Sequence, residues 1–111
     1  MKKVSNSTIK ENFRDYLTTK CGLKHSSAIA YISALNYVSD LLNFNEVIQD
    51  SIYDIRNLHK LMEVKNAATK LDEYDALNDE FHGNCEFSFN HYYDFAAQDS
   101  AFSHKWDNRI R

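Results

Sequence analysis

The sequence contains no proline and only two glycines among its 111 residues, so residues that interrupt helices are almost absent. Strand-and-turn proteins depend on such residues, and their scarcity argues against an all-β fold. Long apolar runs are missing as well, and the basic start at residues 1–3 leads into polar residues instead of an apolar signal region. We therefore expect a cytoplasmic protein, built from long helices and without membrane contact.

Cysteine is scarce too. Cys21 and Cys85 could form one disulfide, but free thiols are the commoner state in a helical protein without a secretion signal. Hydrophobic residues make up 43% of the chain and aromatic residues 14%, which supplies enough apolar surface for one core. The predicted fold class is all-α, with residues 1–111 as a single domain and residues 99–111 as its loosely packed tail.

Apolar residues that recur at spacings of three and four predict where the helices lie. The first helix is predicted over residues 7–20, with Ser7 as a partial N-cap. A second follows a cap region at residues 25–27 and runs to about residue 42, ahead of a turn at 43–45.

The second half of the chain is less regular. Short helical turns are expected within residues 46–55, since Ser51 provides a cap signal there. Residues 57–81 are rich in helix-forming residues and predict either one long helix or two. A break at residues 82–84 precedes a last helix over residues 85–98.

The net charge of −3 is unevenly distributed along the chain. Residues 1–37 contain six Lys or Arg against two acids, giving +4, and residues 38–81 contain four against ten, giving −6. The remaining residues have three against four, giving −1. A basic first third can contact nucleic acid, although a sequence pI of 5.9 is low for a protein that binds bare DNA.

No pattern typical of a catalytic or cofactor site is present in the sequence. The chain lacks a glycine-rich phosphate loop, a Gly-x-Ser-x-Gly elbow and a His-Glu-x-x-His helix. His82, Cys85 and His91 are of the right types for zinc, but a second close pair is missing, and surface or capping histidines are the simpler interpretation. We expect a protein that is not an enzyme and that uses no cofactor and no metal.

The stretch from residue 13 to 42 carries two amphipathic helices joined by a glycine turn. Its distinctive residues are Phe13–Leu17, Gly22–Lys24, Ser26–Ile29, Tyr31 and Leu35. This pattern resembles the first two helices of the SAM-like core-binding domain of tyrosine recombinases, and similar N-terminal modules of modification-dependent restriction systems of the McrB or HNH type. The resemblance implies an orthogonal bundle of four to five helices that contacts DNA through helix ends and basic side chains, while another domain does the cutting.

The predicted nucleic-acid site lies in the turn and at the helix start within this stretch. Backbone N–H groups at a helix start, together with nearby hydroxyls and lysines, are the usual donors to a phosphate. The residues with these properties are Lys20, Lys24, His25, Ser26 and Ser27. An ordinary helix cap with solvated lysines is the alternative interpretation. The corresponding function is a non-catalytic DNA-binding or targeting module of a restriction or recombination system.

The acidic middle segment indicates a different function. A small phage-type inhibitor or DNA mimic could bind a basic nucleic-acid-processing protein, such as a nuclease, through clustered carboxylates and a tail tryptophan. Those residues are Asp72, Glu73, Asp75, Asp79, Glu80 and Trp106. Carboxylates at this spacing also form the solvated face of many helices. The sequence leaves open whether the partner is DNA or protein, and what the oligomeric state is.

Overall fold

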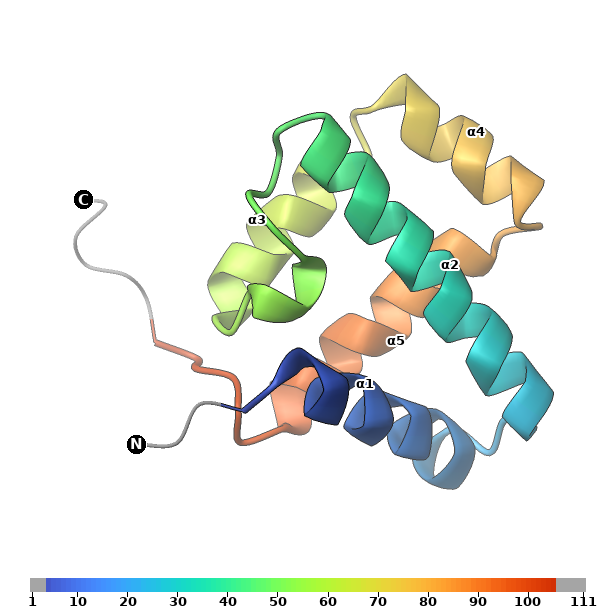
Figure 1. Cartoon of the computed structure of the whole chain (residues 1–111), viewed down its shortest axis with the longest axis vertical. Coiled ribbons are helices and arrows are strands. Elements are labelled where there is room, and N and C mark those ends of the chain that lie inside the picture. The colour runs from blue at the N-terminus through green and yellow to red at the C-terminus, as the bar shows by residue number, and fades with distance from the viewer. Residues whose placement is uncertain (1–3, 106–111) are drawn as a thin grey trace.

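The computed structural model describes residues 4–105, and within them the chain is a bundle of five α-helices (Figure 1). The elements are α1 (Asn6–Asp15), the π-helical turn η1 (Tyr16–Lys20), α2 (His25–Phe44), the 3-10 turn η2 (Ile52–Asp54), α3 (Leu58–Ala68), α4 (Asp72–Glu80) and α5 (Asn84–Gln98). Strand pairing in the described chain is limited to a single bridge. The predicted all-α class is confirmed.

Helices α2 and α5 cross at the centre of the bundle and form its most extensive contact (Figure 1). Helix α1 packs against α2 and η2, α3 packs against α5, and α4 contacts both central helices. The shortest dimension of the molecule is 18 Å. That thickness corresponds to about two layers of helices, since packed helix axes are about 8–10 Å apart.

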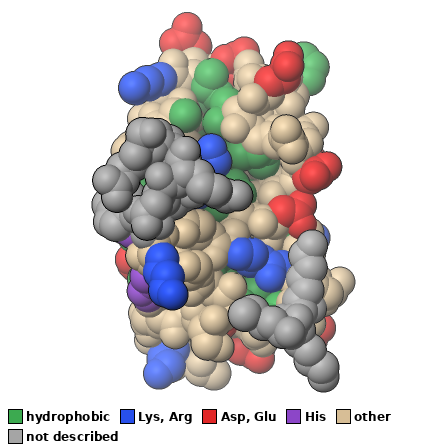
Figure 2. Space-filling model, turned by 90° about the vertical axis from the view of Figure 1, so that its left-hand side faces the viewer, with side chains coloured by type: hydrophobic (Ala, Val, Ile, Leu, Met, Phe, Trp, Pro, Cys, Tyr) green, Lys and Arg blue, Asp and Glu red, His purple; other side chains and the backbone are tan. Residues whose placement is uncertain are grey.

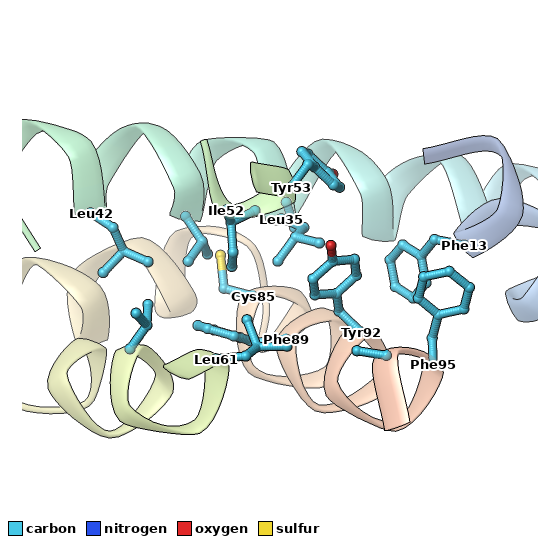
Figure 3. Packing of buried hydrophobic residues seen from close by; sticks show 14 of the residues in the cluster. Phe13, Leu35, Leu42, Ile52, Tyr53, Leu61, Cys85, Phe89, Tyr92 and Phe95 are labelled. Carbon is cyan, nitrogen blue, oxygen red and sulfur yellow. The ribbon is translucent and has the colours of Figure 1, made fainter. Parts of the chain in front are cut away.

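The core is dominated by aromatic rings from elements far apart in the sequence (Figure 3). The ring of Tyr92 in α5 meets Phe13 of α1 edge to face, with 5.1 Å between the ring centroids. It also meets Tyr53 of η2 at 5.6 Å and Phe102, beyond α5, at 6.1 Å. Edge-to-face pairs add to the stabilisation that burial provides, by about 0.5–1.5 kcal/mol each. This cluster fixes where α1, η2 and α5 sit relative to one another.

Two of the predicted helix starts are wrong. Ser5, not Ser7, caps α1, because its backbone is extended and its hydroxyl accepts a hydrogen bond from the N–H of Thr8 at 3.2 Å. The N-cap of α2 is Lys24, so residues 25–27 form the first helical turn and not the cap. Gly22, at φ 70°, reverses the chain early, which lets α2 begin directly after Lys24.

The predicted turn at residues 43–45 is also placed too early. Helix α2 continues through Phe44, and Asn45 closes it by donating from both its backbone N–H and its side-chain Nδ2 to the carbonyl of Leu41. The asparagine therefore acts as a C-cap of the helix. Asn43, which the turn preference of asparagine placed outside the helix, is its second-last residue.

The remaining boundaries follow the prediction more closely. Ser51 caps η2, and its own N–H donates to the carboxylate of Asp54 at 3.1 Å. Residues 57–81 form two helices, which resolves the open alternative. His82 and Gly83 both have positive φ, at 55° and 85°, and make the predicted break before α5.

The tail after α5 is packed more firmly than expected, as far as it is described. Phe102 is buried in the core. Ser103 forms a parallel bridge with Asn57: the N–H of Leu58 donates to its carbonyl at 2.8 Å, and its own N–H donates to the carbonyl of Arg56 at 2.7 Å. Trp106 lies outside the described residues. Of the helices in residues 4–105, none combines the length and apolar character needed to cross a membrane.

Candidate nucleic-acid interface

The structure brings the five residues of the predicted site to one end of the molecule, at the start of α2. Lys20 ends η1 and Lys24 is the N-cap of α2, so the two lysines bracket the turn at Gly22. Both lysines are exposed, as are His25 and Ser26, while Ser27 is half-buried. All five are therefore placed where a large ligand could reach them.

The start of α2 differs from the other helix starts in which side chains offset its free backbone N–H groups. No side chain of the described residues caps it, and its first turn contains no acid. By contrast, Ser5 caps α1 and Asn57 caps α3, and the first turns of α4 and α5 carry acids. The first N–H groups of a helix lack partners within the helix and form the positive end of its dipole. Here that end is left open to an anion from outside.

The hydroxyls around this turn divide into two groups. Those of Thr18 and Thr19 donate to backbone carbonyls of the preceding turn, at 3.2 and 2.6 Å, so they are used within the fold. Those of Ser26 and Ser27 make no side-chain hydrogen bond within residues 4–105. Two hydroxyls beside the open helix start therefore remain able to donate to a bound anion.

Two further cations lie close by, on α1, and were missed in the sequence-based site. Lys10 and Arg14 line a pocket of about 160 Å³ between α1 and α2, together with Glu11, Ile29 and Ile32. The ammonium of Lys10 lies 5.0 Å from the ring centroid of Tyr53 in η2, which is a cation–π contact. We call Lys10, Arg14, Lys20 and Lys24 the basic end. The i, i+4 spacing of Lys10 and Arg14 on a predicted helix was the available signal for this pair.

The chemistry near the turn does not favour a nucleophile. The Sγ atom of Cys21 lies 3.7 Å from Nδ1 of His91, whose ring stacks on Tyr31. Burial raises the pKa of the Cys21 thiol, and the charge of Asp94 raises it further, while a hydrogen bond with Tyr16 lowers it. The reactive form of cysteine is the thiolate, which this environment disfavours.

Other candidate ligand groups stay apart. Within the described chain, no three His, Cys, Asp or Glu side chains gather into a group that could hold a metal ion. Both cysteines are free thiols, with Cys85 fully buried.

Helix α4 carries the second charged surface. Its five carboxylates are exposed, and none forms an ion pair within residues 4–105. Three of them lie in the first turn, where they also stabilise the helix dipole. The five residues, which we call the acidic helix face, are Asp72, Glu73, Asp75, Asp79 and Glu80. Beyond the end of α4, the ring of Phe81 packs on that of Tyr37 in α2, with 5.1 Å between centroids.

The two signs of charge are mixed on the side of the molecule shown in Figure 2. Lys and Arg side chains are spread over that side, with acidic side chains at the upper end, along the right-hand edge and at the lower end of the view (Figure 2). A surface of mixed sign produces no strong field of one sign.

Comparison with known proteins identifies no family model, no curated protein and no solved structure that this chain matches. A functional assignment therefore depends on the charges, helix caps and exposed side chains of the chain itself.

Proposed function

We propose that the chain is a non-catalytic helical module that binds the phosphate backbone of DNA, of the kind that targets a restriction or recombination enzyme to its substrate. The observation that carries the proposal is the open start of α2, which within residues 4–105 has no side-chain cap and no acid in its first turn but has lysines on both sides. Backbone N–H groups, two free hydroxyls and Lys24 converge there, as in other helix starts that bind phosphate.

The basic end extends this contact beyond a single phosphate. Lys20 lies on the far side of the Gly22 turn, and Arg14 lies on α1 beside Ile29. Each neutralised phosphate contributes about 0.9 to the slope of log affinity against log salt. We expect the lysines on both sides of the turn to neutralise separate phosphates.

The negative net charge limits how DNA can approach. The acidic helix face repels a phosphate backbone, while the basic end attracts it, so the chain has one favourable orientation on a duplex. Binding should be weak in isolation and strongly dependent on salt. This behaviour suits a targeting module whose affinity adds to that of an attached domain.

The proposal is tested by fluorescence anisotropy with a short labelled duplex over a series of salt concentrations. Changing Lys20→Glu and Lys24→Glu together should lower the affinity at least about tenfold and reduce the salt slope by about two, because two phosphate contacts are lost. The matched control is Lys60→Glu with Lys70→Glu, which makes the same charge change at exposed positions on α3 and after it. Equal losses in both double variants, or an unchanged slope in the first, would overturn the proposal.

A second candidate function is supported by the acidic helix face. Five unpaired carboxylates beside exposed Tyr37 could imitate a phosphate backbone and bind a basic nucleic-acid-processing protein. The test is inhibition of DNA cleavage by a nuclease with a basic DNA-binding surface. Inhibition that is lost in the uncharged variant Asp72→Asn, Glu73→Gln, Asp79→Asn supports this function, and inhibition that is absent or unchanged rejects it.

A further inference from the structure

The outward face of α2 has an unusual composition for an exposed helix surface. Over its 20 residues α2 carries one acid, Asp40, and no Lys or Arg. The residues that point away from the core recur at spacings of three and four and are all exposed: Ile29, Ala30, Ser33, Tyr37, Asp40 and Phe44. Ile29, Tyr37 and Phe44 are 49%, 53% and 83% exposed. We call these six residues the outward stripe.

A helix that is apolar on both faces is normally buried on both faces. In this structure α5 covers the inner face of α2. In the described chain the outward stripe is contacted only in part: Ile29 borders α1 and Tyr37 packs on Phe81. The side chains of Ala30 and Ser33, in the N-terminal half of the stripe, are small. Small side chains allow a second helix to approach closely there.

The charges near the N-terminal and C-terminal halves of the stripe have opposite sign. Near its N-terminal half, Lys10, Glu11 and Arg14 of α1 line a pocket with Ile29, and together these three side chains have a net charge of +1. Its C-terminal half contains Asp40, and Tyr37 there packs on Phe81, the residue that closes the acidic α4. Figure 1 shows α1 and α4 at opposite ends of the molecule, on either side of the middle of α2.

We infer that the outward stripe binds a second copy of this chain, with the two α2 helices antiparallel about a two-fold axis near Ser33 and Tyr37. In this arrangement the Arg14 end of each copy faces the Asp40 end of the other, so the charge contact is made twice. The helix dipoles are also antiparallel, which is favourable. DNA, or another partner whose charge is all of one sign, would be complementary in charge to only one half of the stripe. It would also leave the apolar residues of the stripe uncovered.

The inference concerns the outward face of α2 and is separable from DNA binding, because it is tested without DNA. Sedimentation equilibrium of the full chain should give a mass that rises with concentration toward twice the 13.0 kDa of one chain. Ser33→Glu places two like charges near the axis and should shift the chain to monomer over the whole concentration range. Asn90→Glu, the same charge change at an exposed position on α5, should leave self-association unchanged.

A charge exchange tests the antiparallel orientation. Arg14→Glu alone and Asp40→Arg alone should each weaken self-association at least about threefold, because each change removes both copies of the charge pair. The double variant should recover most of the loss. Circular dichroism spectra that match the wild type show that each variant is folded.

Three outcomes would overturn the inference. The wild-type chain could remain monomeric at millimolar concentration, Ser33→Glu could dimerise as well as Asn90→Glu, or the double variant could be weaker than either single one. The last outcome would show that Arg14 of one copy does not pair with Asp40 of the other.

Discussion

At the scale of single residues, the core contains a hydroxyl that makes no hydrogen bond. Tyr92 is fully buried, and its Oη has no partner within the described residues. The neighbouring Tyr53 is also buried but donates to Oδ1 of Asn36 at 2.7 Å. Burial raises the pKa of both phenols well above the usual range. A buried polar group without a partner costs about 1–3 kcal/mol, so the two hydroxyls have opposite effects on stability.

Phenylalanine substitutions separate these effects. Tyr92→Phe should leave the free energy of unfolding unchanged or raise it by up to about 1 kcal/mol, because it removes the unpaired hydroxyl. Tyr53→Phe should lower it by about 1 kcal/mol, because the hydrogen bond to Asn36 is lost. Urea denaturation of both variants provides the comparison. A similar loss in Tyr92→Phe would mean that its hydroxyl has a partner, such as an ordered water.

The two cysteines should differ in reactivity. Burial raises the pKa of Cys85 from 9.0 to about 11, with a further contribution from Glu80. Cys21 is only half-buried. A thiol reagent at mildly alkaline pH should therefore modify one thiol per folded chain and two in urea. Cys21→Ser should abolish the reaction of the folded protein, and rapid labelling of that variant would contradict the assignment.

The raised pKa of Cys85 also affects stability. A thiol whose pKa is higher in the folded chain contributes its full stabilisation below pH 9, and this is lost as pH rises from 9 toward 11. The free energy of unfolding should therefore fall over that interval. Cys85→Ala should show a smaller fall than the wild type when both are measured by urea denaturation across that interval.

At the scale of the elements, helix caps decide where α1 and α2 begin. Ser5→Ala should destabilise the protein by about 1 kcal/mol, because it removes the acceptor for the N–H of Thr8. Ser26→Ala should change stability by less than about 0.5 kcal/mol, since Ser26 lies in the first turn and caps nothing. Thermal unfolding of the two variants compares them directly. A larger loss of stability in Ser26→Ala would instead support the N-cap that the sequence predicted at residues 25–27.

Much of the helical framework follows from the sequence because it depends on local spacing. The periodicity of residues 85–98 and the glycine break before it place α5 within one residue. The starts of α1 and α2 were misplaced because several Ser residues compete as caps, and the backbone conformation decides among them. Sequence spacing cannot supply that information.

The candidate site was likewise predictable only where its residues are close together in the sequence. Lys20–Ser27 form one turn and helix start, so their proximity could be predicted from a local signal. Arg14 joins them only because α1 packs across α2, which is a tertiary contact. The outward stripe was not identified from the sequence. Its exposed apolar residues are recognised only once α5 is placed against the other face of α2.

At the scale of the whole molecule, the basic end and the outward stripe adjoin, because Arg14 of the basic end lies beside Ile29 of the stripe. DNA and a second copy of the chain should therefore compete. Adding excess duplex to the self-associated protein should yield complexes that contain one chain, seen as a fall in protein stoichiometry by sedimentation velocity with labelled protein. Lys20→Glu with Lys24→Glu, which leaves the stripe intact, should prevent this dissociation. A stable complex of two chains and one duplex would contradict the competition.

The segment between η2 and α3 holds both described ends of the chain. Arg56 donates from Nη2 to the carbonyl of Val4 at 2.8 Å and to Oδ1 of Asn6, while Asn57 donates from Nδ2 to the carbonyl of Lys105 at 2.7 Å. Neither end can therefore fray without disturbing residues 55–57. The amides of Leu58 and Ser103 should exchange with deuterium at one shared rate, because a single opening event exposes both.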